Sequence, residues 1–285
     1  MITDDDTASD TSLVPQNTHI GLSDQDDGEH APFLIYTLQR TGGTNLTQRL
    51  NRRSPFKMAQ HEPFNQPRVY GDVTRAWKET RDLTALRSAI DAICAKRENI
   101  KHCVEMVPWK ITETLIESAE HAGYRHLFLA RRDRARRLLS MEYAQRTKVW
   151  GPSHTDKVAF DTTAFEVPLN VDELVAHEER CVKLLNKTWE ILRSHDVKPA
   201  YLIYEDVYGP NFGTARDHLG IALRYLGLSR GTLKDTKLTE ALRSEGDQHT
   251  RDRYGQFRGV EALRERISAL PSFAFEHEPV VEAKP

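Results

Sequence analysis

Short apolar runs alternate with amphipathic segments along most of the chain. Four runs have the length and apolar character of buried strands, namely residues 33–38, 102–107, 126–130 and 201–204. Apolar residues at helical spacing predict five helices between and after them, at residues 45–51, 83–95, 112–122, 134–146 and 171–192. Strands that alternate with helices indicate crossover connections. The expected fold is therefore α/β, with a P-loop-like central parallel sheet and helices on both faces.

The first 30 residues differ from the rest of the chain. They contain eight Asp or Glu, no Lys or Arg, and few large apolar side chains. Such a stretch cannot bury enough apolar surface to offset the conformational entropy that it would lose on folding. We therefore expect an acidic disordered tail over residues 1–30 and a single domain over residues 31–285. A domain of that length buries about 70–75% of its chain surface on folding.

Composition narrows the class of protein. With 39% hydrophobic and 29% charged residues the chain is expected to be soluble and globular. A net charge of −2 argues against a general nucleic-acid binder. No apolar run approaches the ~20 residues of a membrane span, and the N-terminus lacks the features of a secretory signal. Three well-separated cysteines and the lack of a histidine ligand pattern predict a cytoplasmic protein without a disulfide or metal site.

The segment after the first predicted strand has the features of an anion site. It reads Gln39-Arg40-Thr41-Gly42-Gly43-Thr44-Asn45 and leads into a helix. Glycines let the backbone approach a ligand, and the first amides of a helix attract anions. The simpler interpretation is a strand-to-helix turn with Thr44 as N-cap. The GxxxxGK[ST] pattern is absent and no Asp is clearly placed for magnesium, which weakens the case for a nucleotide kinase.

A basic segment follows the third predicted strand. Five of residues 131–137 are arginines, although cations are disfavoured at a helix start unless an anion neutralises them. The simple interpretation is a solvated face, above all for Arg134 and Arg137. Arg131 or Arg132, at the strand end, is expected to face the same sheet edge as Arg40. A second anion site close to the first would explain both segments.

Together these segments resemble the PAPS-dependent sulfotransferases, and in particular their bacterial type (PAPS is 3′-phosphoadenosine-5′-phosphosulfate). Residues 40–44 match the family's R/K-[ST]-G-[GST]-T loop, which holds the 5′-phosphosulfate. Arg132 and Ser140, eight positions apart, match the family's pair for the 3′-phosphate. Residues 204–206 also resemble its Tyr-Glu-Asp element. The resemblance covers residues 33–206 and fades beyond; Arg251, Arg253 and Arg258 are candidates to replace the family's C-terminal nucleotide loop.

The resemblance implies a sulfotransferase that moves a sulfuryl group from PAPS to a hydroxyl or amine without a metal, leaving adenosine 3′,5′-bisphosphate. It implies eight cofactor-binding residues, Arg40, Thr41, Gly42, Gly43, Thr44, Asn45, Arg132 and Ser140. Arg40 would also stabilise the bridging oxygen of the donor, which makes it a candidate catalytic residue.

The general base is expected in the segment Gln60-His61-Glu62-Pro63-Phe64, which resembles a Glu-Pro-Phe segment of bacterial and carbohydrate sulfotransferases. By that resemblance Glu62 is the base, and burial is expected to raise its pKa. His61 is the second candidate. His102 and Glu105, near the end of the second predicted strand, stay open as alternatives.

Acceptor binding is assigned to Trp109 and Lys110, which follow the second predicted strand. The alternatives are a core Trp and an ordinary exposed Lys. The long loop over residues 150–168 is a further candidate for acceptor selection. A small molecule, a glycan and a lipid headgroup all remain possible acceptors, and the oligomeric state is open. The rival functions are a nucleotide-dependent phosphoryl transferase and a catalytically inactive nucleotide-binding module.

Overall fold

The sheet is the centre of the molecule. The computed structural model describes residues 30–150, 165–244 and 251–277, without the side chains of residues 251–253. The strands are β1 (Phe33–Thr37), β2 (Ile100–Cys103), β3 (Arg125–Ala130) and β4 (Ala200–Ile203). They pair in the order β2-β1-β3-β4, and every pairing is parallel. The expected α/β fold with a parallel central sheet is confirmed.

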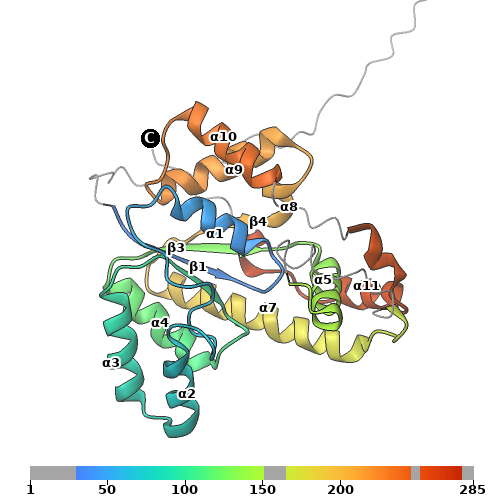
Figure 1. The fold of residues 1–285 in the computed structure, drawn as a ribbon, viewed down its shortest axis with the longest axis horizontal. Coiled ribbons are helices and arrows are strands. Elements are labelled where there is room, and N and C mark those ends of the chain that lie inside the picture. Colours follow the sequence, from blue (N-terminus) through green and yellow to red (C-terminus); the bar gives the residue numbers. More distant parts are fainter. Residues whose placement is uncertain (1–29, 151–164, 245–250, 278–285) are drawn as a thin grey trace, which may run out of the picture.

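Helices lie on both sides of this sheet (Figure 1). In the N-terminal half they are α1 (Gly43–Asn51), α2 (Gly71–Thr80), α3 (Leu83–Cys94), α4 (Trp109–His121) and α5 (Arg134–Thr147). In the C-terminal half they are α7 (Val171–Ser194), α8 (Tyr204–Tyr208), α9 (Phe212–Tyr225), α10 (Thr232–Ser244) and α11 (Val260–Ser268), with short 3₁₀ turns at η2 (Arg251–Gln256) and η3 (Ala274–His277). The predicted helices correspond to α1, α3, α4, α5 and α7.

Two cores form because successive strand residues point to opposite faces. Phe33 and Ile35 of β1 belong to a cluster with buried residues of α1, α9 and α10. Leu34 and Tyr36 belong to another, with residues of α3, α4 and α7. The blue α1 and orange α9 and α10 lie on one side of the sheet in Figure 1, and α3, α4 and α7 lie on the other. A third cluster joins α5 and α11 to the first turns of α7.

The second strand differs from its prediction. It covers Ile100–Cys103 rather than residues 102–107, and the chain turns immediately after Cys103. Val104 and Val107 are buried although they lie outside the strand, which is why an apolar run misplaced it. Lys101 lies inside the strand, and its side chain is buried all the same. Similarly, Tyr204 begins α8 rather than ending the fourth strand.

The strand order places two loops at one point of the sheet edge. β1 lies between β2 and β3, so the chain leaves β1 for one neighbour and later returns across it to the other. In such sheets ligands bind beyond the carboxyl ends of the strands at the point where the order reverses. The loops after β1 and β3, which carry Arg40 and the basic segment, meet there.

Two predicted segments fall largely outside the described residues. They are the acidic tail, except for His30, and the candidate acceptor loop between residues 151 and 164. Among the helices that the structure describes, none is both long enough and apolar enough for a membrane span.

Candidate functional site

The first helix begins without a capping side chain in the described structure. Gly42 is its N-cap residue, at φ +78°, and α1 starts at Gly43. Thr44 is therefore inside the helix, and its interpretation as the N-cap is wrong. The first helical hydrogen bond runs from the Leu46 amide to the Gly42 carbonyl, at 3.2 Å. The preceding amides thus lie at the positive end of the helix dipole, where an anion is favoured.

The carbonyls of the same loop are held by side chains. This loop is residues 38–42, and we call it the β1–α1 loop. Four of its carbonyls accept such bonds: Leu38 from Thr41 Oγ1 at 2.7 Å, Gln39 from Arg137 at 3.1 Å, Arg40 from Arg131 at 3.3 Å, and Gly42 from Tyr208 at 2.9 Å. With its acceptors occupied in this way, the loop has mainly donors to offer a ligand.

Arg40 joins the two segments that the sequence singled out. Its Nε donates to Ser140 Oγ at 2.9 Å, and its Nη1 donates to the Trp150 carbonyl at 2.7 Å. The backbone of Arg40 is left-handed, at φ +65°. Burial lowers the pKa of the guanidinium from its ordinary value, but a guanidinium stays charged at any physiological pH. The β1–α1 loop and α5 are thus in direct contact.

Arg132 is paired elsewhere. Its guanidinium makes two hydrogen bonds to the Asp206 carboxylate, at 3.2 and 3.1 Å, and its amide donates to Glu205 at 2.8 Å. The hydrogen bond that Arg132 donates to Asp206 raises the pKa of Arg132. About half of the side chain is exposed. The structure therefore brings Ser140 to Arg40, and Arg132 to the Tyr-Glu-Asp element after β4.

The solvated-face interpretation of Arg134 and Arg137 is wrong. Arg137 is fully buried and forms an ion pair with Glu178 of α7. Arg134 donates to the carbonyls of Ile267 and Leu270 at the end of α11, at 3.1 and 3.0 Å, where a cation complements the dipole. Two of the crowded arginines thus serve to join α5 to its neighbours.

A buried lysine that the sequence analysis missed lies beside the start of α1. Lys101 of β2 is only 4% exposed. Its Nζ lies 2.8 Å from Glu62 Oε1 and 3.4 Å from both Thr44 Oγ1 and His61 Nε2. His61 Nε2 is in turn 2.8 Å from Thr44 Oγ1. Strand register explains why this side chain is buried. Lys101 pairs with Ile35, whose side chain is on the α1 face of the sheet.

This cluster sets the charges of both candidate bases. Burial alone would raise the pKa of Glu62, but the charge and hydrogen bond of Lys101 outweigh burial and lower it. The expected rise is therefore wrong. Burial, reinforced by the charge of Lys101, lowers the pKa of His61 to about 4. Near neutral pH Glu62 is thus ionised and His61 is neutral, so each has a lone pair that can accept a proton.

The other two candidate bases have structural partners. His102 is buried, with Nε2 2.9 Å from Thr112 Oγ1, and burial lowers its pKa to about 4. Glu105 accepts a hydrogen bond from the Gln39 amide at 2.6 Å. Burial raises the pKa of Glu105, although Arg137 opposes the rise. Its Oε2 is buried and has no hydrogen-bond partner among the described residues.

Trp109 and Lys110 occupy the first turn of α4 and share a partner. Trp109 Nε1 lies 3.4 Å from Glu113 Oε1, and Lys110 forms an ion pair with the same carboxylate. The ammonium of Lys187, on α7, lies 4.2 Å from the centre of the Trp109 ring. Both predicted acceptor residues therefore belong to a cluster between α4 and α7.

Two tyrosines of α8 cover the outer side of Gly42. Tyr204 and Tyr208 stack with their ring centres 4.6 Å apart, and the Arg131 guanidinium lies 4.5 Å from the Tyr204 ring. A Cβ atom added to Gly42 would lie 2.9 Å from Tyr208 and 3.0 Å from Tyr204. Together with the positive φ, this contact requires glycine at position 42.

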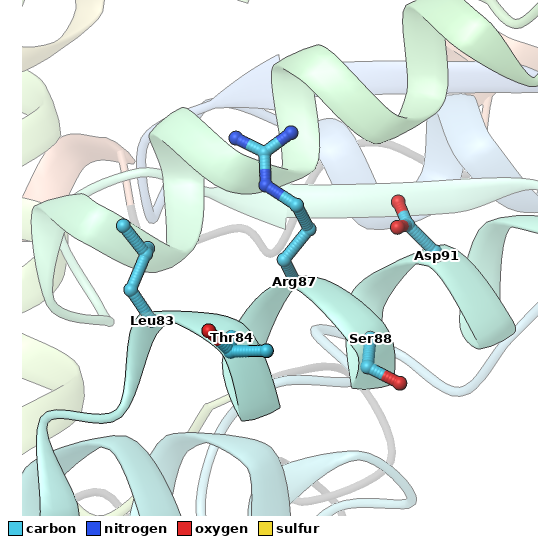
Figure 2. A pocket seen from close by; sticks show the side chains of 5 residues that line it. All are labelled: Leu83, Thr84, Arg87, Ser88 and Asp91. Carbon is cyan, nitrogen blue, oxygen red and sulfur yellow. The ribbon is translucent and has the colours of Figure 1, made fainter.

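A surface hollow elsewhere does not add to this site. It has a volume of about 440 Å³ and is lined by side chains of α3, namely Leu83, Thr84, Arg87, Ser88 and Asp91 (Figure 2). Its charged groups are engaged, because Arg87 pairs with Glu117 and Asp91 accepts a hydrogen bond from Ser118 of α4. The two charged side chains of the hollow thus serve the contact between α3 and α4.

Two further predictions have limited outcomes. Within the described ranges no three His, Cys, Asp or Glu side chains are grouped as metal ligands. Of the C-terminal arginines, the side chains of Arg251 and Arg253 lie outside the described structure, and the Arg258 carbonyl accepts the Leu169 amide at 3.0 Å.

No protein-family model matches the chain, and the search of curated protein sequences finds no match.

Proposed function

We propose that this chain transfers a sulfuryl group from PAPS to a hydroxyl or amine acceptor. The observation that carries the proposal is the hydrogen bond between Arg40 and Ser140, at the start of α1. It joins a helix N-terminus suited to one anionic group to a second polar segment 100 positions away in the sequence. A donor with separate 5′-phosphosulfate and 3′-phosphate groups needs two such adjoining sites.

The residues present fit the anionic end of this donor. The first amides of α1, Arg40 and Thr44 would hold the phosphosulfate, and Lys101 lies within reach of the Thr44 hydroxyl. Ser140 and Arg132 would hold the 3′-phosphate, as the family resemblance implies. Arg132 would then exchange its Asp206 partner for phosphate, and both are acceptors for its planar fork. When bound, the donor supplies the sulfuryl group and a phosphate leaving group.

The side chains divide the chemical work between them. Arg40 and Lys101 stabilise the negative charge that develops on the leaving phosphate and the sulfuryl oxygens. Fixed cations of this kind can take the part that metal ions play in phosphoryl transfer. Glu62 removes the proton of the acceptor. Its ion pair with Lys101 keeps it ionised before the acceptor arrives.

His61 is the alternative base. It is neutral near pH 7 and its Nε2 lies 2.8 Å from Thr44 Oγ1, so it borders the same anion site. Glu62 is preferred because a carboxylate beside a buried ammonium can lose that partner to the donor and become more basic.

Calorimetry with adenosine 3′,5′-bisphosphate tests the donor site directly. We expect this nucleotide to bind at least about tenfold more tightly than adenosine 5′-phosphate, because a charge-assisted contact is worth ~1.5–3 kcal/mol. Adenosine 5′-phosphate is the matched control, since it differs only in the 3′-phosphate. Equal affinities would contradict the assignment of a second anion site.

Turnover separates the proposal from its rivals. Labelled PAPS with a panel of sugar, lipid and phenol acceptors should give a labelled product, with a rate unaffected by EDTA. Magnesium-dependent ATP consumption without sulfuryl transfer would instead identify a phosphoryl transferase. Tight bisphosphate binding with no transfer to any acceptor would identify a nucleotide-binding module.

A further inference from the structure

The backbone of Gln39 is held by charged side chains on both of its polar groups. Its N–H donates to Glu105 Oε1 at 2.6 Å, and its carbonyl accepts from Arg137 Nη1 at 3.1 Å. Glu105 comes from the turn after β2, whereas Arg137 comes from the second turn of α5. The segments that follow the two neighbours of β1, namely the turn after β2 and helix α5 after β3, thus fix one residue of the β1–α1 loop.

Arg137 is itself held by a third element. It is fully buried and pairs with Glu178 of α7, which is also fully buried. The charge of Glu178 outweighs the cost of burial and raises the pKa of Arg137. In a low-dielectric interior a hydrogen bond from a charged group is strong, and breaking the pair would leave a buried charge unpaired. The guanidinium therefore has little freedom to leave the Gln39 carbonyl.

The residue that follows Gln39 needs such a hold. Arg40 has φ +65°, in the left-handed region that non-glycine residues seldom adopt. A residue in that region keeps its conformation only when its surroundings impose it. Because the Gln39 carbonyl belongs to the peptide plane that leads into Arg40, the bond from Arg137 fixes the orientation from which the Arg40 side chain departs.

We propose that Glu105 and Arg137, the latter held by Glu178, are positioning residues that grip Gln39 and thereby aim Arg40 at the anion site. The catalytic consequence of this role rests on the proposed function. The grip on Gln39 is a property of the protein without a ligand, so it can be measured separately.

The variants are chosen so that the core is kept. Arg137→Met with Glu178→Met replaces the buried pair by apolar side chains of similar length, so neither member of the pair is left as an unpaired buried charge. Glu105→Ala removes the acceptor for the Gln39 amide, and Glu105→Gln keeps an acceptor oxygen there. The matched control is Arg53→Met with Asp235→Leu, a partly buried ion pair between the end of α1 and the start of α10.

Hydrogen–deuterium exchange of peptides over residues 38–46, in the protein without nucleotide, measures the grip. We expect about tenfold faster exchange in R137M/E178M and in E105A, as for the loss of one charge-assisted hydrogen bond. E105Q and the control pair should stay within about twofold of the unmodified protein. The affinity for adenosine 3′,5′-bisphosphate should fall in parallel, and kcat should fall by a larger factor than the KM for PAPS rises, because Arg40 acts on charge that develops in the transition state.

Three results would overturn the proposal or part of it. Unchanged exchange over residues 38–46 in both R137M/E178M and E105A would refute the grip itself. Loss of turnover in E105Q with unchanged exchange would make Glu105 the base rather than a positioning residue. Faster exchange in the variants of a protein that binds no bisphosphate would refute the proposed function and the catalytic consequence, while the grip on Gln39 would stand.

Discussion

The ammonium of Lys101 lies 2.8 Å from Oε1 of Glu62, and both side chains are largely buried. One comes from β2 and the other from the segment after α1, so the pair spans the space beside the start of that helix. A buried ion pair depends on both partners, because removing either leaves the other charge without compensation. We therefore expect a substitution of either residue to change the electrostatic environment of the other.

Replacing Lys101 by Met should change the pH profile. Without the ammonium, the strongest influence that opposes burial is lost, and the pKa of Glu62 rises from its lowered value. The acid limb of kcat/KM should move to higher pH, and kcat should fall by about 10²–10³, as for the loss of one charge-stabilising group. Lys78→Met, at an exposed position of α2, is the control. An acid limb that does not move would contradict the coupling.

Glu62→Gln tests the assignment of the base. The amide cannot accept the proton of the acceptor, so turnover should fall by ~10²–10⁴. Affinity for adenosine 3′,5′-bisphosphate should change little, because the carboxylate is not a predicted nucleotide ligand. Steady-state rates and calorimetry measure the two effects. If E62Q stays near normal while His61→Gln loses turnover, His61 is the base.

Arg132 and Asp206 should have opposite effects on nucleotide binding. Arg132→Ala removes a proposed 3′-phosphate ligand and should weaken bisphosphate binding at least about tenfold, with little effect on adenosine 5′-phosphate. Asp206→Asn removes the carboxylate that pairs with this guanidinium, and should leave bisphosphate affinity equal or higher. Calorimetry of both variants decides the matter. Unchanged binding in R132A would reject the assignment.

Gly42→Ala should destabilise the protein more than Gly123→Ala. Both glycines have φ above +70°, but a Cβ at Gly42 meets two tyrosine rings, whereas nothing lies within 4 Å of one at Gly123. G123A should cost about 1 kcal/mol through backbone conformation alone, and G42A about 2–4 kcal/mol because overpacking adds to it. Urea unfolding measures both. Equal losses of stability would mean that the two tyrosine rings move aside without an energetic cost.

Stability should fall in mild acid. Burial lowers the pKa of His102 and of His126 to about 4 from 6.5. Between these values the unfolded chain binds protons that the folded protein does not, so stability is full above pH 6.5 and is lost as pH falls toward 4. Unfolding at pH 5 should need ~2 kcal/mol less per histidine than at pH 7.5. His126→Gln should remove the part of this loss that His126 causes. Equal stability at both pH values would contradict the burial of these rings in their neutral form.

Much of the sheet could be predicted because its signals are local. An apolar strand followed by a glycine pair and a helix, as at residues 33–51, combines period, turn and helix start in one stretch. The error at β2 has the opposite cause: Val104 and Val107 are buried by tertiary packing beyond the strand, so apolar character did not mark the strand's end. Helices α9 and α10 were missed because they pack on α1 and the sheet through few, scattered apolar residues.

The candidate site could be predicted only in part. Arg40 was predicted from its glycine-containing loop and Ser140 from a family pattern, and the two side chains are in contact. The partners of Arg132 and Arg137 were beyond reach, because Asp206 and Glu178 lie 74 and 41 positions away and only the fold brings them together. Lys101 was overlooked for a similar reason, since a lysine is normally exposed and only strand register makes this one face inward.

The side chains that occupy the loop's carbonyls come from the end of β3, from α5 and from α8, besides the loop itself. The same sequence, grafted between a strand and a helix of another protein, would lack the hydrogen-bond donors that lie outside the loop. Its carbonyl oxygens rather than its amides could then face a ligand. The consequence for protein engineering is that the β1–α1 loop cannot be transplanted by itself; the ends of β3 and β4, with α5 and α8, have to be transferred with it.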